Sequence, residues 1–180
     1  MLFYLTTSYS NACFGPISRQ NIVGGITSGF LSVYKQKVSL TCNSHHPLYI
    51  ITAIEGGFYI YDNSSNRFIC WRGKNVVGMN YKVIHRKGHW KMCKFQDNVE
   101  SPQDAYIYLS NYGRKNTKLT LHPKKSWGCM PKVSVVKNFL KYPSEKCDCE
   151  KTHELFCRTR LKNMNELSKV CKKDVKELCN

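Results

Sequence analysis

The chain has 180 residues, enough for one domain with a substantial core and an extension. Its 28 Lys and Arg outnumber its 12 Asp and Glu, which gives a formal net charge of +16. Such an excess causes self-repulsion in the folded state, so it indicates a polyanionic partner: nucleic acid, an anionic membrane or a sulfated polysaccharide. No stretch is long and apolar enough for a transmembrane helix, so we expect no membrane insertion.

Ten cysteines favour disulfides formed in an oxidising compartment. Zinc sites usually contain paired C-x-x-C knuckles, whereas this chain has only a single C-x-C, Cys147-Asp148-Cys149. The cysteines therefore predict a secreted, extracellular protein without a metal site.

Residues 1–14 resemble a poor signal segment. Their apolar run, from Leu2 to Leu5, is shorter than the roughly 7–15 residues expected, although Ser10-Asn11-Ala12 resembles a cleavage site. We interpret the segment as a truncated or atypical signal, or as the result of a misassigned start codon.

The next part of the chain predicts strands. The stretches 29–40, 57–71 and 105–111 are rich in Tyr, Phe, Ile and Val and are bounded by Gly, Asn, Ser or Pro. A tight turn at residues 72–75, Arg-Gly-Lys-Asn, predicts a hairpin with apolar strands on both sides. Short strands with turn signals throughout are typical of an all-β sandwich or barrel.

A weak internal repeat refines this expectation. "FYIYDN" starts at Phe58, and "AYIYLSN" starts 47 residues later at Ala105. The strands that start at Leu48, Cys93 and Lys137 are 45 and 44 residues apart. Three units of about 40–47 residues, each with several short strands, favour a threefold β barrel, the β-trefoil.

The tail, residues 143–180, has a different composition. It carries 9 basic and 7 acidic side chains, against 19 and 5 before it. Apolar residues recur every three or four positions, which predicts a helix with Thr152 as a plausible N-cap. These residues are Leu161, Met164, Leu167, Cys171, Val175 and Leu178. Cysteines near the apolar face favour a helix stapled onto the barrel or onto itself, and the alternative is a separate binding module.

Several motifs, in order, resemble the fibroblast growth factor family. In that family an Arg-Tyr/Phe-Leu/Ile-Cys hairpin is followed by Cys-x-Phe, a Leu-Glu run that ends in Tyr, and a closing Phe-Leu strand. The corresponding residues are Arg67-Phe68-Ile69-Cys70, Cys93-Lys94-Phe95, Val99-Glu100 through Tyr106, and Phe139-Leu140. The match covers about Gly29 to Pro143. Residues 79–92 look like a longer loop than usual, and the Cys-rich tail has no counterpart, which indicates a distant member of invertebrate or viral style.

The resemblance implies a β-trefoil over residues 15–142, followed by the Cys-rich, helical extension. It implies a secreted ligand that binds heparan sulfate and the ectodomain of a receptor tyrosine kinase of the fibroblast growth factor receptor type. Such a ligand brings two receptors together without doing chemistry, so no enzyme activity and no cofactor are expected. Position by position, the implied receptor contacts are Glu100, Asp104, Tyr106, Leu140 and Tyr142.

The densest basic segment, residues 113–141, contains no acidic residue. Lys as a point charge and Arg as a planar fork both suit sulfate, and in the family this region binds heparan sulfate. The implied binding residues are Arg114, Lys115, Lys118, Lys124, Lys125, Lys132 and Lys137. A second cluster in the long loop either extends this surface or serves solubility: Lys82, Arg86, Lys87, Lys91 and Lys94.

Other partners and activities find less support. No zinc-finger, RRM or helix-turn-helix pattern occurs, and the aromatic residues are spread through strands, so no nucleic-acid partner is expected. The alternative is a trefoil module that binds glycosaminoglycan or nucleic acid without receptor activity. His85 and His89 have i, i+4 spacing, but Gly88 and the surrounding basic charge argue against a helical metal site. No acidic pair and no evident free thiol suit catalysis.

The sequence also predicts two covalent modifications, a disulfide and a glycan. In a trefoil, Cys70 and Cys93 would come close enough for a disulfide, and the alternative is two free thiols buried in the barrel core. Asn63-Ser64-Ser65 is a glycosylation sequon at an expected turn.

Overall fold

The computed structural model describes residues 17–24, 29–42, 47–53, 55–99, 107–122, 134–144 and 148–160. Within these ranges the chain forms mainly strands. The elements are β1 (Ile17–Gly24), β2 (Phe30–Tyr34), β3 (Lys37–Thr41), β4 (Leu48–Thr52), β5 (Phe58–Asp62), β6 (Arg67–Arg72), β7 (Asn75–Met79), α1 (Tyr81–Lys87), the 3-10 helix η1 (His89–Cys93), β8 (Lys94–Val99), β9 (Ile107–Asn111), β10 (Arg114–Lys118), β11 (Asn138–Pro143) and α2 (Cys149–Arg160).

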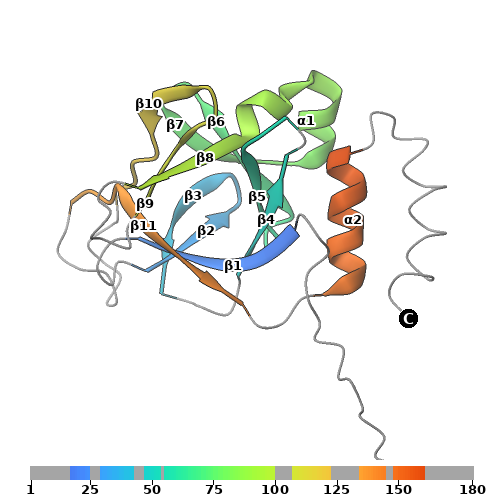
Figure 1. Cartoon of the computed structure of the whole chain (residues 1–180), viewed down its shortest axis with the longest axis horizontal. Helices are drawn as coiled ribbons and strands as arrows, with labels where there is room; N and C mark the ends of the chain where they lie inside the picture. The colour runs from blue at the N-terminus through green and yellow to red at the C-terminus, as the bar shows by residue number, and fades with distance from the viewer. Residues whose placement is uncertain are drawn as a thin grey trace, which may run out of the picture.

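Six strands close into an antiparallel ring, in the order β1, β4, β5, β8, β9, β11 and back to β1 (Figure 1). The ring closes because β11 returns along β1, with Leu140 opposite Val23 and Tyr142 opposite Asn21. Closure pairs both edges of each of these six strands, so the ring offers no open edge for aggregation. The largely β architecture expected from the sequence is confirmed.

Two hairpins, β2–β3 and β6–β7, continue the sheet beyond the ring. The turn predicted at residues 72–75 is confirmed. Gly73 takes φ +65° in it, and Trp71 lies opposite Val76 on the two strands that the turn connects. Buried Asp62, at the end of β5, ties the β2–β3 hairpin to the turn that follows β5. Its carboxylate accepts hydrogen bonds from the backbone N–H of Val33 at 2.8 Å and of Ser64 at 2.9 Å.

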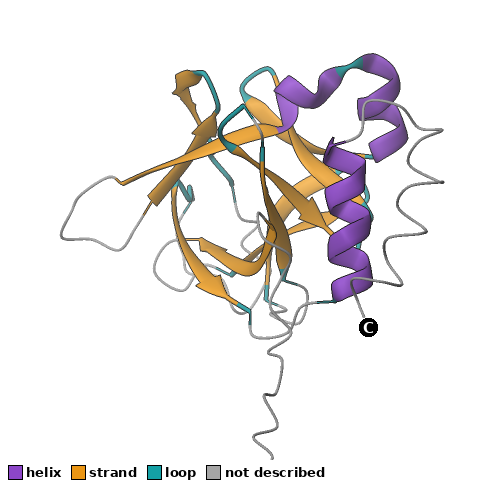
Figure 2. Cartoon of the chain, turned by 45° about the vertical axis from the view of Figure 1, so that its right-hand side comes forward, coloured by secondary structure: helices purple, strands orange, loops and turns teal. Residues whose placement is uncertain are grey.

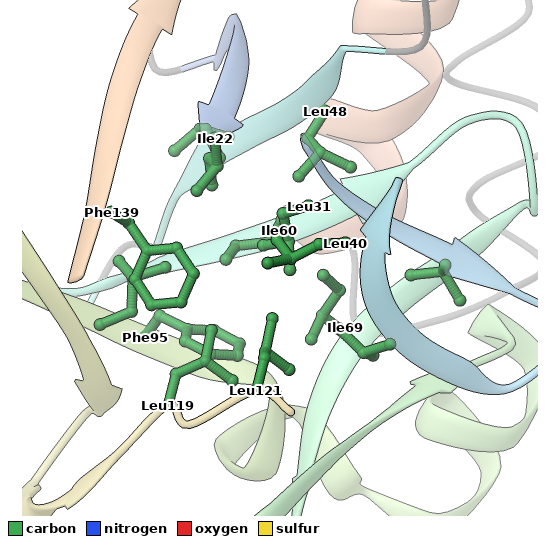
Figure 3. Packing of buried hydrophobic residues seen from close by; sticks show 14 of the residues in the cluster. Ile22, Leu31, Leu40, Leu48, Ile60, Ile69, Phe95, Leu119, Leu121 and Phe139 are labelled. Atoms are coloured by element: carbon green, nitrogen blue, oxygen red, sulfur yellow. The ribbon is translucent and has the colours of Figure 1, made fainter. Parts of the chain in front are cut away.

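The ring encloses an inner core of aliphatic and aromatic side chains (Figure 3). Each ring strand contributes alternate residues to it, because successive side chains of a strand point to opposite faces. The fully enclosed members include Ile22, Leu31, Leu48, Ile60, Ile69, Phe95 and Phe139. Leu119, Leu121 and Val136, which lie outside the ring strands, also pack there.

A second, outer core covers one side of the ring. The alternate residues of β4, β5 and β6, such as Tyr49, Tyr61 and Phe68, point away from the inner core and are nevertheless buried. Helices α1, η1 and α2 lie over this side, as Figure 2 shows on its right. The helices therefore explain why β5 is buried along its whole length.

Residues 79–92 are not the long loop that the sequence suggests. They end β7 and then form α1 and most of η1. Asn80 caps α1 by accepting a hydrogen bond from Lys82 N–H at 2.9 Å, and Gly88 ends the helix in the left-handed conformation. Tyr81 and Ile84 are buried in the outer core. Because an isolated helix of seven residues is unstable in water, this packing is what holds α1.

Helix α2 packs on the outer core through Leu155, with Phe156 partly buried against the same cluster. Thr152 as the N-cap is wrong: the helix starts at Cys149, and the Asp148 carboxylate accepts from Lys151 N–H at 2.9 Å. The sequence predicted a helix stapled by cysteines onto the barrel or onto itself; α2 packs on the outer core, and which of the two staples occurs stays a prediction. The apolar positions from 161 to 178 lie outside the described residues, as do residues 1–14.

Candidate functional site

Strand β10 carries the first part of the predicted polysaccharide surface. Arg114 and Lys118 are exposed, and Lys118 Nζ lies 3.9 Å from the centre of the Tyr108 ring on β9. Lys115 belongs to the same strand. The pairing of β10 with β9 is irregular, since Arg114 lies opposite Asn111 but Lys118 lies opposite Ser110. This bulge alters the strict alternation of side chains along β10.

A bridge between Leu121 and Val136 brings the two ends of the following segment together. Exposed Lys137 comes directly after Val136, and the next residue, Asn138, lies opposite Tyr108. Lys137 therefore lies on one side of β9, with Arg114 and Lys118 on the other side of the same strand, and we call these three residues the β10 surface. The predicted residues Lys124, Lys125 and Lys132 lie outside the described residues.

Lys141, also in this basic segment, is committed to the fold. Its Nζ lies 2.7 Å from Asp97 Oδ2 and 4.2 Å from the centre of the Phe58 ring. An ammonium paired with a carboxylate and packed on a ring is a poor candidate for a sulfate ligand.

The second basic cluster is only partly as predicted. Four of its members are exposed on α1 and η1, and we call them the α1 surface: Lys82, Arg86, Lys87 and Lys91. Lys94 is not part of it, because its side chain is 7 % exposed and its Nζ lies 3.0 Å from Glu55 Oε2. Lys94 is the first residue of β8 and pairs there with Tyr59 of β5, so its position within the ring accounts for its burial.

The two implied receptor residues that the structure describes, Leu140 and Tyr142, lie on β11, which contributes no residue to the outer core beneath the helices. Leu140 is half-buried on β11, and Tyr142 is 50 % exposed on the same strand. Glu100, Asp104 and Tyr106 lie outside the described residues; the strand ends that flank them, Val99 and Ile107, lie opposite each other.

Pairing adds neighbours to this surface that the sequence does not indicate. Val23 lies opposite Leu140, Asn21 lies opposite Tyr142, and Tyr108 lies opposite Asn138. Only the strand register reveals them, because β1 and β11 are more than a hundred residues apart in the chain.

The structure contains the predicted Cys70–Cys93 disulfide. Both residues are fully buried, but they belong to the outer core rather than to the barrel core. The bond ties β6 to the end of η1. We call residues 81–93, which form α1 and η1 and carry the α1 surface, the excursion, and the bond closes its base. Cys42 and Cys157 are also disulfide-bonded, and no free cysteine occurs among the described residues.

Asn63 is exposed in the turn between β5 and β6, as expected for a glycosylation sequon. The backbone N–H of the neighbouring Ser64 donates a hydrogen bond to Asp62 Oδ1. The position is accessible, and its occupancy stays a prediction.

The remaining polar residues form no cluster suited to metal binding within the described ranges. His85 is on α1 and His89 is on η1, with Gly88 breaking the helix between them. Burial raises the pKa values of Tyr49, Tyr61 and Tyr81 beneath the helices. The expectation that the chain is not an enzyme stays a prediction.

Among the described helices, none is long and apolar enough to cross a membrane. A scan against protein-family models found no match, and a search of curated proteins found none either.

Proposed function

We propose that this protein is a secreted growth-factor-like ligand with a β-trefoil fold, of the type that the fibroblast growth factor family represents. It binds heparan sulfate and, by the same resemblance, the ectodomain of a receptor tyrosine kinase. The observation that carries the proposal is the strand order. The resemblance implied a trefoil, which combines a six-stranded barrel with three hairpins; a closed ring of six strands with two hairpins and β10 is consistent with it.

The distribution of surfaces also favours a ligand. Helices cover the outside of β4, β5 and β6, so that side is used for folding. Strands β9 and β11 contribute no residue to the outer core, and they carry exposed Tyr142 and half-buried Leu140. A small apolar centre with a polar rim is the usual composition of a binding hot spot.

The test of the whole proposal is receptor activation. Cells that carry a receptor of the fibroblast growth factor type and lack heparan sulfate are treated with the pure protein, with and without added heparin. We expect receptor phosphorylation only when heparin is present. Retention on heparin without phosphorylation in either condition would favour the alternative, a trefoil glycosaminoglycan-binding module without receptor activity.

The β10 surface should contribute to polysaccharide binding. We expect the triple variant Arg114→Gln, Lys118→Gln, Lys137→Gln to elute from heparin resin at lower salt than the wild type. Loss of three ionic contacts with sulfate groups should also reduce the slope of log affinity against log salt concentration by about 2–3.

A matched control is available for this variant. Lys37, Arg72 and Lys74 are exposed on the hairpins, and their replacement by Gln removes the same two Lys and one Arg. We call this control the hairpin triple. If the two triple variants elute at the same salt, net charge alone explains retention and the β10 surface is not a site.

The receptor surface is tested by truncation of its two described members. Leu140→Ala and Tyr142→Ala should each lower receptor affinity by about 1–3 kcal/mol, which is about 5- to 150-fold. Binding to an immobilised receptor ectodomain measures the loss. Tyr34→Ala is the matched control for Tyr142, because Tyr34 is 72 % exposed on the β2–β3 hairpin. Wild-type affinity in both β11 variants would place the receptor site elsewhere.

A further inference from the structure

Helix α1 and η1 present one sign of charge to solvent. Residues 81–93 contain four Lys and Arg and no acidic residue. All four cationic side chains are exposed: Lys82, Arg86, Lys87 and Lys91. At 3.6 residues per turn, Lys82 and Arg86 fall on the side away from buried Tyr81 and Ile84, and Lys87 is exposed at the flank beside Ile84. The charge therefore faces outward as a group.

These cations have no ion-pair partner in the described part of the chain, in contrast to several others. Lys94 is paired with Glu55, Lys141 with Asp97, and Lys151 with Glu154. The fold thus neutralises basic side chains where it uses them for packing. On the α1 surface it leaves them unneutralised.

The arrangement is unfavourable for α1 itself. Lys82 lies in the first turn, where the positive end of the helix dipole disfavours a cation. Lys82 and Arg86 are one turn apart, a spacing at which like charges destabilise a helix. Arg86 and Lys87 in the last turn do suit the dipole, but that explains only half of the cluster. A bound anion would relieve all of these repulsions.

The excursion is also rigidly held. Its base is closed by the disulfide between Cys70 and Cys93, and Trp90 packs edge-on against Tyr59 and Phe68. Rigid presentation lowers the entropy lost when a charged ligand is bound.

From these observations we propose that the α1 surface is a second binding site for a sulfated polysaccharide, separate from the β10 surface. In both views β10 and α1 lie at the upper end of the molecule, on opposite sides of it (Figures 1 and 2). The choice of a polysaccharide rests on the proposed extracellular function. Single-stranded nucleic acid needs exposed rings for stacking, whereas Tyr81 is buried and Trp90 packs inward. An anionic membrane needs exposed apolar residues beside the cations, and none of residues 81–93 is an exposed large hydrophobic residue.

The test is a set of matched triple variants on heparin. The α1 triple, Lys82→Gln, Arg86→Gln, Lys87→Gln, removes two Lys and one Arg, as do the β10 triple and the hairpin triple. We expect the α1 triple to bind heparin about ten- to a hundredfold more weakly than the hairpin triple at physiological salt, with a salt slope lower by about 2–3. Combining the α1 and β10 triples should lower the slope by the sum of both changes. Circular dichroism and thermal unfolding confirm that each variant is folded.

The outcomes separate the hypotheses. Equal heparin affinity of the α1 triple and the hairpin triple would overturn the proposal. So would a loss by the α1 triple that appears only with phosphatidylserine vesicles or with single-stranded RNA. If the α1 triple loses heparin affinity while the wild type activates no receptor, the second site stands and the proposed ligand function fails.

Discussion

Replacing Cys70 and Cys93 together with alanine is expected to lower the free energy of unfolding by about 3 kcal/mol. The disulfide spans 23 residues, and closing a loop of that length removes about this much entropy from the unfolded chain. Both sulfurs are fully buried in the outer core, so the lost packing adds to the effect. Urea unfolding without reductant, followed by tryptophan fluorescence, measures the change.

The matched control for this double variant is Ile84→Val, which removes one methyl(ene) group from the same cluster and keeps the cross-link. Its expected loss is about 1 kcal/mol. A double variant no less stable than Ile84→Val would show that the cross-link contributes nothing to stability. Because the disulfide closes the base of the α1 and η1 excursion, amide hydrogens of residues 81–93 should exchange faster in the double variant than in the control.

Phe68→Ala is expected to cost about 3–5 kcal/mol of unfolding free energy. The Phe68 ring is fully buried, and its centre lies 4.9 Å from that of Tyr61 and 5.3 Å from that of Trp90. Its removal leaves a cavity between β6 and η1, at the point where the helices meet the ring of strands. The loss should equal that of Phe95→Ala in the inner core, because both rings are fully enclosed.

Two further variants test whether the loss of stability comes from the buried volume of the Phe68 ring. Phe68→Leu keeps most of the volume and should cost less than half as much as Phe68→Ala. Tyr34→Ala removes an aromatic ring that is 72 % exposed and should change stability by less than about 0.5 kcal/mol. If Phe68→Ala behaved like Tyr34→Ala, the helices would not form a second core with the strands.

The two cores explain a pattern in the strand sequences. Strands β2 and β3 alternate between buried and partly exposed residues, as "FLSVY" and "KVSLT" indicate. Strand β5, "FYIYD", is buried at every position, and β4 is buried at four of five. A continuous apolar run in a short strand indicates that both faces are covered. The sequence thus contained a signal for the side on which the helices pack.

Other features were predictable because they depend on local chemistry. The hairpin at residues 72–75 follows from Gly73, which adopts positive φ without strain, and the strands follow from runs of β-branched and aromatic residues. The turn between β2 and β3 was harder to predict from the sequence, because Lys35 takes φ +56° although it is neither Gly nor Asn. Pairing along the whole of β2 and β3 imposes this conformation.

The sequence by itself determined the class of the chain: a largely β domain, rich in cysteine and strongly basic. Only the tertiary structure decided which cations are available to a partner. Lys94 and Glu55 are 39 residues apart, and Lys141 and Asp97 are 44 apart, so neither ion pair is visible in a local pattern. Likewise, α1 is too short to be stable alone and exists because Tyr81 and Ile84 are buried against strands from elsewhere in the chain. Charge is a property of each residue, whereas burial and pairing depend on which distant segments the closed ring brings together.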